Sequence, residues 1–195
     1  MGINRNGRFA AVTNYRKFPL EGPFSTSRGD LVKDFLTSDI SPDIYLEKLR
    51  SEGGKYEGYN LLFGNADAMY YHSNRGAESK LTSDIYGISN HLLDTPWPKV
   101  SKGKKAFREK VMGSGKFEKE DLFAILKDEE KARDEDLPDT GIGLEKERLL
   151  SSIFIKSPEY GTRISTVLSI DDGGGVKYCE QSHLPSASQD FAFQV

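Results

Sequence analysis

Three segments of the 195-residue chain place chemically capable side chains where a predicted strand runs into a loop. They are "AAVTNYR" with Asn14, "YGISNHLLDTPWPK" with Asn90, and "YGTRIST" with Arg163. Binding and catalytic groups gather where strands of a rigid scaffold open into loops. An asparagine amide can polarise a carbonyl, and an arginine offers a fork of donors to a carboxylate or phosphate. The alternative is that each asparagine only stabilises a turn through local backbone hydrogen bonds.

The first half of the chain must build the elements that carry the two asparagines. Residues 2–14 are predicted to form a hairpin that turns at Asn6-Gly7, the pair preferred in type I′ turns. Ser27 and Ser41 each fit the N-cap of a helix, and Pro42 fits the first helical position after Ser41. Apolar and aromatic runs predict the next strands, which are residues 56–64, 68–73 and 85–90.

The second half begins with a stretch around Pro96 and Pro98 that is predicted to be irregular, since proline removes a backbone donor and restricts its neighbour. Helices are expected from Ser101 to Met112 and over 118–127, followed by a charged surface loop over 128–141. Strands are then predicted over 151–157, 161–171, 175–181 and 190–195, with a hairpin loop at 171–175. Because strands and helices come in blocks, the prediction is one α+β domain, residues 1–195, with mostly antiparallel sheets.

Composition excludes several classes of function. The formal net charge is −3 and the pI is about 5.7, so no overall basic field attracts nucleic acid, and no nucleic-acid partner is expected. No run of about 18 apolar residues occurs, so an integral membrane protein is not expected. The only cysteine, Cys179, lies in an alternating strand and is expected to be a structural thiol.

The ordered series "GRFAAVTNYR", "SRGDLV", "YNLLFG", "YGISNHLLDTPWPKV", "LPDTG" and "YGTRISTVLSID…EQS" covers nearly the whole chain and resembles the NRDE family. That family is also called the transport and Golgi organisation protein 2 family. Its members normally begin with Met-Cys and carry an Asn-Arg-Asp-Glu motif upstream of the "TNY" strand. Since this chain opens on "MGINRNG", the resemblance implies an N-terminally truncated chain that lacks core strands of the fold.

The family resembles the N-terminal-nucleophile hydrolases, which implies a four-layer αββα sandwich. In those enzymes an N-terminal cysteine attacks an amide with its own amino group as base. By resemblance, Asn14 and Asn90 take the positions of the two site asparagines, and Arg163 that of the arginine near the nucleophile. The chain lacks that cysteine, so no amide hydrolysis is expected from it.

The resemblance further implies haem trafficking in the cytoplasm or mitochondrion, with an acyl-CoA-like amphiphile as another possible ligand. Haem iron needs an axial donor, and His91 is predicted to be that ligand because it follows Asn90. The alternative is that His91, like His72 and His183, is an ordinary surface or loop histidine. Trp97 is expected either to wall the pocket or to anchor its loop. The basic helix with Lys102 and Arg108 is interpreted either as a contact for propionates or phosphates or as a solvated face.

Two hypotheses remain open from the sequence. In the first, a degenerate hydrolase pocket binds and carries haem or a related amphipathic cofactor. In the second, the chain is the remainder of a cysteine-dependent amidohydrolase or acyltransferase. Loss of core strands would leave an exposed sheet edge, so a homodimer is possible.

Overall fold

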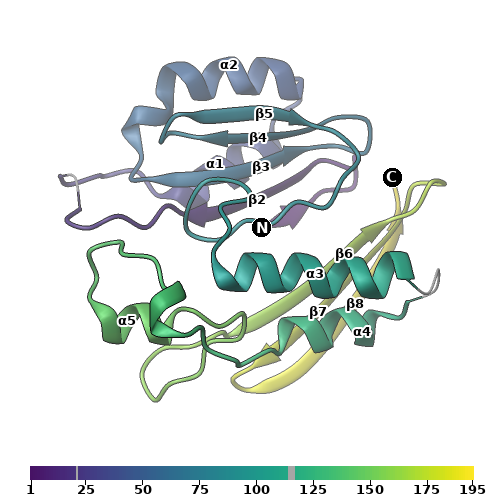
Figure 1. The fold of residues 1–195 in the computed structure, drawn as a ribbon. Helices are drawn as coiled ribbons and strands as arrows, with labels where there is room; N and C mark the ends of the chain where they lie inside the picture. Colours follow the sequence, from purple (N-terminus) through teal and green to yellow (C-terminus); the bar gives the residue numbers. More distant parts are fainter. Residues whose placement is uncertain (21, 114–116) are drawn as a thin grey trace. The chain divides into compact units, whose positions relative to one another are not determined.

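The computed structural model describes residues 1–20, 22–113 and 117–195, which fall into two compact units, Met1–Thr95 and Pro96–Val195 (Figure 1). The first unit contains β1 (Gly2–Ile3), β2 (Phe9–Asn14), α1 (Arg28–Thr37), α2 (Pro42–Glu52), the 3₁₀ turn η1 (Gly53–Lys55), β3 (Tyr59–Gly64), β4 (Met69–Ser73) and β5 (Ala77–Leu81). The second contains α3 (Pro98–Gly113), α4 (Lys119–Leu126), η2 (Asp134–Asp136), α5 (Leu144–Leu149), β6 (Ile164–Ile170), β7 (Gly175–His183) and β8 (Ser186–Gln194).

Both sheets are antiparallel meanders. The strand order is β1-β2-β3-β4-β5 in the first unit and β6-β7-β8 in the second. Mixed helices and antiparallel sheets confirm the predicted α+β class. The four-layer αββα arrangement and the single domain over residues 1–195 stay predictions.

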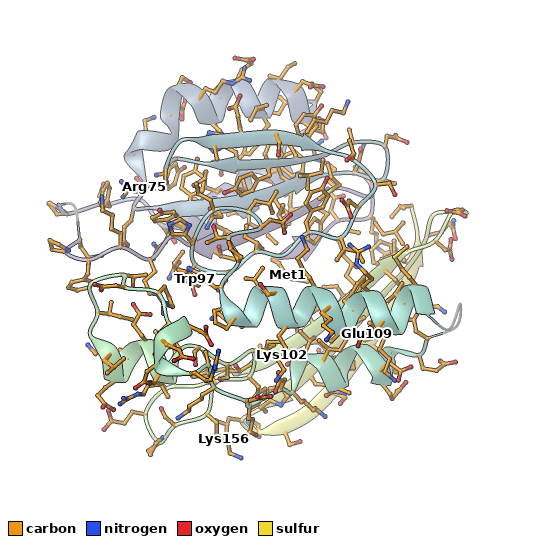
Figure 2. The ribbon with its side chains drawn as sticks, viewed as in Figure 1. Met1, Arg75, Trp97, Lys102, Glu109 and Lys156 are labelled. Carbon is orange, nitrogen blue, oxygen red and sulfur yellow. The ribbon has the colours of Figure 1, made fainter. Side chains whose placement is uncertain are left out.

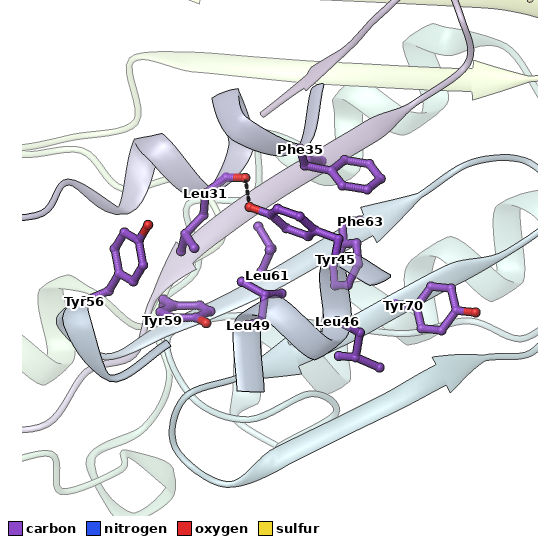
Figure 3. Packing of buried hydrophobic residues seen from close by; sticks show 11 residues of the cluster. Leu31, Phe35, Tyr45, Leu46, Leu49, Tyr56, Tyr59, Leu61, Phe63 and Tyr70 are labelled. Carbon is purple, nitrogen blue, oxygen red and sulfur yellow. Dashed lines mark hydrogen bonds between the residues drawn. The ribbon is translucent and has the colours of Figure 1, made fainter. Parts of the chain in front are cut away.

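Alternation along β3 separates a helix-covered face of the first sheet from a polar one. Tyr59, Leu61 and Phe63 are fully buried and pack with residues of α1 and α2 in one hydrophobic cluster (Figure 3). The Tyr45 hydroxyl donates to the Leu31 carbonyl over 2.7 Å, which joins the two helices inside this cluster. Asn60 lies between these strand residues and therefore points to the opposite face, yet it is also fully buried.

The predicted helix starts of the first unit are confirmed. The Ser27 hydroxyl accepts from the Gly29 N–H, and the Ser41 hydroxyl accepts from the Ile44 N–H, with Pro42 at the first helical position. Side-chain oxygens at these positions satisfy amides that have no partner within the helix.

The turn at Asn6-Gly7 is not the predicted type I′. That turn needs a positive φ at both central residues. Of the two, only Gly7 has a positive φ, which is 73°. The Asn4 side chain shapes the turn instead, because its Oδ1 accepts from the N–H groups of Asn6 and Arg8.

Two other predicted strands are wrong, and the predicted basic helix forms but starts earlier than expected. Residues 85–90 form no strand; the strand that follows β4 is β5, whose "AESKL" sequence has no apolar run. The basic helix α3 begins at Pro98 rather than Ser101, since a proline at the first helical position loses no hydrogen bond. Residues 151–157 form no strand beyond an isolated bridge between Lys156 and Gly161.

In the second unit, α4 is tied to the sheet by an ion pair between Lys119 and Asp190 of β8. Cys179 is opposite Asp190 in the β7–β8 register and is buried, as expected for a structural thiol. Burial, together with the neighbouring Asp190, raises the pKa of this thiol, so it stays protonated near neutral pH. Among the helices of the described residues, none has the length and apolar character that crossing a bilayer demands.

Candidate functional site

The two predicted asparagines meet in the first unit, although 76 residues separate them. The Asn90 side-chain amide donates to the main-chain carbonyl of Asn14 over 3.1 Å, and the Arg16 N–H donates to the Asn90 carbonyl over 2.7 Å. Asn90 therefore fastens its loop to the end of β2. By strand alternation the Asn14 side chain lies on the face of Val12, so Asn90 contacts the backbone of Asn14 rather than its amide group.

His91 is held at both ring nitrogens. Its Nε2 is 2.8 Å from the Tyr15 hydroxyl and its Nδ1 is 2.8 Å from Thr95 Oγ1. The Thr95 hydroxyl has one hydrogen, which it donates to the Leu92 carbonyl, so Thr95 must accept from Nδ1–H. Nε2 is then unprotonated and accepts from Tyr15. Burial also lowers the pKa of His91, which favours this neutral form.

A second chain of hydrogen bonds runs through buried Asn60 to the same loop. The Leu93 N–H donates to the Tyr71 hydroxyl over 3.1 Å, and Tyr71 donates to Asn60 Oδ1 over 2.8 Å. The Asn60 amide donates to Thr13 Oγ1 over 3.2 Å, and Thr13 donates to the Ser89 carbonyl over 2.8 Å. Asn60 thereby connects β2, β3 and β4 with residues 89–93.

The loop between residues 87 and 94 is closed at its ends. Asp94 accepts from the Gly87 N–H at Oδ1 over 2.7 Å, and its own N–H donates to the Gly87 carbonyl over 2.8 Å. Asp94 adopts a left-handed φ of 57°. Such a φ is uncommon for a residue other than glycine and is most often found for Asn and Asp. The closed loop presents Asn90 and His91 in one conformation.

The predicted arginine belongs to the second unit, where it borders a cavity of about 670 Å³. Three cations and two carboxylates share this lining with apolar and aromatic groups; the charged members are Lys127, Glu129, Lys156, Glu159 and Arg163 (Lys156 is labelled in Figure 2). Lys156 and Glu129 form an exposed pair at 3.4 Å. The cavity that contains Arg163, hereafter the Arg163 cavity, thus combines apolar walls with a net positive charge.

His183 is the histidine of this cavity. Its Nε2 lies 2.9 Å from the hydroxyl of buried Ser165, and the Phe154 ring meets the imidazole edge-on with ring centroids 4.8 Å apart. The His183 N–H also donates to the Arg163 carbonyl over 2.8 Å. Backbone, serine and phenylalanine together hold the ring at the cavity wall.

Trp97 and the basic helix α3 make contacts within the second unit. Trp97 is buried, and its carbonyl accepts from the N–H groups of Val100 and Ser101 at the start of α3, which agrees with an anchor for its loop. On α3, Lys102, which is labelled in Figure 2, forms ion pairs with Asp128 and Glu130. Ligand contacts from Trp97 or this helix stay predictions.

The structure adds residues that the sequence analysis missed. Asn60 was detectable as the polar position within the apolar run "YNLLFG", and Asp94 as the acidic residue before the proline-rich "TPWP" stretch. No local sequence pattern indicated Ser165 or Tyr71, because their contacts depend on strand register. Whether Arg163 joins Asn14 and Asn90 in one site stays a prediction, as does the ligand role of each.

Comparison with known proteins assigns the chain to a family. The model of the family described as Transport and Golgi organisation 2 matches residues 1–185. The chain belongs to this family. A human Transport and Golgi organization protein 2 homolog is 37% identical over 196 residues, which cover 93% of this chain and 71% of that protein. The mouse homolog is 35% identical, with 94% and 71% covered.

A more distant relative is the Drosophila Transport and Golgi organization protein 2, which is 26% identical over 185 residues, covering 81% of this chain and 62% of that protein. The family match extends across both compact units. Asn14, Asn90, Arg163 and His183 therefore all lie within the part of the chain that the family shares.

Proposed function

We propose that the protein binds and carries an amphipathic anion, with haem as the first candidate, in the cytoplasm or mitochondrion. The observation that carries the proposal is the Arg163 cavity, whose volume is about 670 Å³. Small-molecule sites usually occupy between roughly 300 and roughly 1000 Å³, so the cavity falls within that range. Reversible carriage also agrees with a family named for transport.

The lining of the cavity suits a ligand with an apolar body and an acidic edge. Phe154, Tyr160 and Leu184 supply apolar surface. Arg163 and Lys156 supply cations together with Lys127, and a guanidinium binds carboxylates and phosphates through paired hydrogen bonds. Haem carries two propionates on a flat apolar ring, and an acyl-CoA-like molecule carries phosphates on an apolar chain, so both fit this description.

The proposed iron ligand has less support from the geometry than the proposed anion contacts. His91 remains the predicted axial ligand, but its Nε2 accepts from Tyr15 and its Nδ1 donates to Thr95. Coordination through Nε2 would require the Tyr15 hydroxyl to leave. The anion contacts in the Arg163 cavity and the iron contact of His91 are therefore separate predictions, each tested by its own variant.

Haem titration followed by the Soret band tests the proposal. Wild-type protein should shift the band at micromolar haem, and Arg163→Gln combined with Lys156→Gln should weaken binding about ten-fold or more, since each removes a charge-assisted contact. Arg5→Gln is the matched control, because Arg5 is an exposed cation of the first unit. No Soret shift with wild-type protein would rule out haem carriage.

His91→Ala measures the axial role separately. A Soret band that moves to the position of free or pentacoordinate haem in this variant would support His91 as the iron ligand. An unchanged band would remove His91 from the site and leave the anion contacts as the basis of binding.

The second candidate, a cysteine-dependent amidohydrolase or acyltransferase, is favoured by one observation: Asn14 and Asn90 lie together at the end of β2. A variant extended to begin with the Met-Cys segment of the family should then release amine from acyl-amide substrates. Turnover that survives a Cys→Ser change at the new terminus would end this hypothesis.

A further inference from the structure

We propose that His183, positioned by Ser165, is an anion-contacting residue of the Arg163 cavity, and that the ligand carries a carboxylate or phosphate head on an apolar body. This inference rests on the proposed function only in that the cavity must bind an amphiphile; it does not require that the amphiphile be haem.

Strand register places His183 beside Arg163. Ile164 is paired with Ser182, so Arg163, immediately before β6, is opposite His183 at the end of β7, and the His183 N–H donates to the Arg163 carbonyl. Ser165 is two residues from Arg163, and the 2.9 Å contact of its hydroxyl with His183 Nε2 brings the imidazole to this segment. A guanidinium and an imidazole therefore border one stretch of cavity wall.

The Ser165 contact holds the imidazole in either charge state. A serine hydroxyl can donate to an unprotonated Nε2 or accept from Nε2–H, so its hydrogen bond with His183 survives protonation of the ring. His183 can thus gain a positive charge without losing its position.

The other charges of the cavity nearly cancel, and a bound anionic head favours a positive charge on the neighbouring imidazole. Lys127 follows α4, Lys156 and Glu159 belong to the loop before β6, and Glu129 pairs with Lys156. Three cations against two carboxylates leave one positive charge in the lining. Histidine is the side chain whose charge ordinarily changes between about pH 5 and about pH 8, whereas carboxylates and ammonium groups ordinarily keep theirs. Protonation of His183 therefore strengthens the attraction for an anionic head.

The test uses decyl sulfate, an amphiphile whose charge stays constant in this pH range, and isothermal titration calorimetry below its micelle concentration. For wild-type protein we expect the dissociation constant to fall about three- to ten-fold between about pH 8 and about pH 5.5, the size of one added charge near a partly solvated anion. His183→Gln keeps a hydrogen-bonding group for Ser165 but cannot gain the charge, so its affinity should not change with pH. Decanol, which is neutral, should bind without this pH dependence.

Ser165 is tested as a positioning residue. Ser165→Ala should reduce the pH-dependent gain in decyl sulfate affinity, and Ser165→Thr, which restores a hydroxyl, should recover it. His72→Gln is the control, because His72 contacts the Tyr59 hydroxyl in the first unit and has no proposed ligand role, so the gain should stay intact. Decanoate and decyl phosphate, compared at about pH 7.5, then show which head group is bound more tightly.

Three results would overturn the inference: no decyl sulfate binding, a pH-independent affinity of wild-type protein, or a pH-dependent gain that persists in His183→Gln. The proposed function fails differently. Haem binding without the decyl sulfate effect would leave carriage standing and remove His183, whereas the decyl sulfate effect without haem binding would retain His183 and exclude haem as the cargo.

Discussion

Asn60 is the residue on which the polar side of the first sheet depends. It is fully buried, and it receives a hydrogen bond from Tyr71 while donating one to Thr13. A buried polar group is stable only when its hydrogen bonds are made, and its removal leaves its partners unsatisfied.

Asn60→Ala should therefore lower the free energy of unfolding by about 2–4 kcal/mol, since it leaves the buried Tyr71 hydroxyl without an acceptor and opens a cavity. Urea unfolding monitored by circular dichroism gives the value. The matched control is Asn6→Ala, because Asn6 is exposed in a turn. That control should change stability by less than about 0.5 kcal/mol. Equal effects of the two changes would contradict the role given to Asn60.

Protonation of buried histidines should lower the free energy of unfolding as the pH falls below neutral. Burial lowers the pKa of His72 and of His91, so between the folded and unfolded pKa values the unfolded chain binds more protons. By linkage, the stabilisation is present above the unfolded pKa of about 6.5 and is lost as the pH falls through the lowered folded values. The carboxylates with lowered pKa, such as Glu78, lose their contribution only in more acidic solution.

The free energy of unfolding should accordingly decrease as the pH is lowered from about 7.5 to about 5. Urea denaturation at several pH values measures the slope, and His72→Gln should reduce it, because glutamine can still accept from the Tyr59 hydroxyl but does not titrate. A slope of opposite sign, or one unaffected by the change, would show that these histidines are not buried in their neutral form.

At the scale of elements, the hairpin between β3 and β4 depends on a glycine with no room for a side chain. Gly64 has a φ of 150°, and a Cβ there would lie 2.1 Å from the Ala68 carbonyl oxygen. Gly76, in the next hairpin, also has a positive φ, 96°, but a Cβ there would meet nothing within 4 Å.

Gly64→Ala should destabilise the protein by more than Gly76→Ala, which carries only the backbone strain of roughly 1–2 kcal/mol. The clash with backbone at Gly64 adds to that strain and should push β3 and β4 apart. Thermal unfolding of the two variants makes the comparison. Equal melting temperatures would mean that the turn after β3 relaxes without cost.

Local signals predicted the elements whose determinants lie within a few residues. The caps at Ser27 and Ser41 and the strands β2, β3 and β4 are of this kind. The strand expected over 85–90 failed because of a contact with a residue outside it: Asp94 occupies both backbone groups of Gly87, so no ladder can run through that segment. The meeting of Asn14 and Asn90 likewise follows from packing of a distant loop on β2, which no local pattern encodes.

At the scale of the whole molecule, the buried apolar residues are unevenly distributed. The aromatic and aliphatic cluster of the first unit includes Leu31, Phe35, Tyr45, Leu61 and Phe63. In the second unit, by contrast, β8 is exposed along nearly its whole length, and Phe191 is 54% exposed. Backbone hydrogen bonds that are covered by few apolar contacts open more easily than those in a dense core.

Hydrogen exchange followed by mass spectrometry should therefore find the slowest amides in β3, the central strand of the first sheet, and the fastest strand amides in β8. The physical reason is that β3 is bonded on both edges and buried, whereas β8 ends the order β6-β7-β8. Protection of β8 comparable with that of β3 would show that another surface covers β8 in solution.

The α+β class and the family could be predicted from the sequence. Both depend on patterns that extend along nearly the whole chain: the grouping of strands and helices into blocks, and the order of the motifs. The Arg163 cavity could not be predicted, since Lys127, Arg163 and His183 come together only through the antiparallel register of β6 and β7 and the placement of the loop before them.

The one-way order of donors from Tyr15 through His91 and Thr95 to the Leu92 carbonyl has an evolutionary consequence. Loss of the Thr95 hydroxyl removes the acceptor of Nδ1–H, whereas the Tyr15 hydroxyl can accept as well as donate. Position 95 should therefore keep a hydroxyl over the history of the family wherever position 91 is histidine, while position 15 is free to vary more.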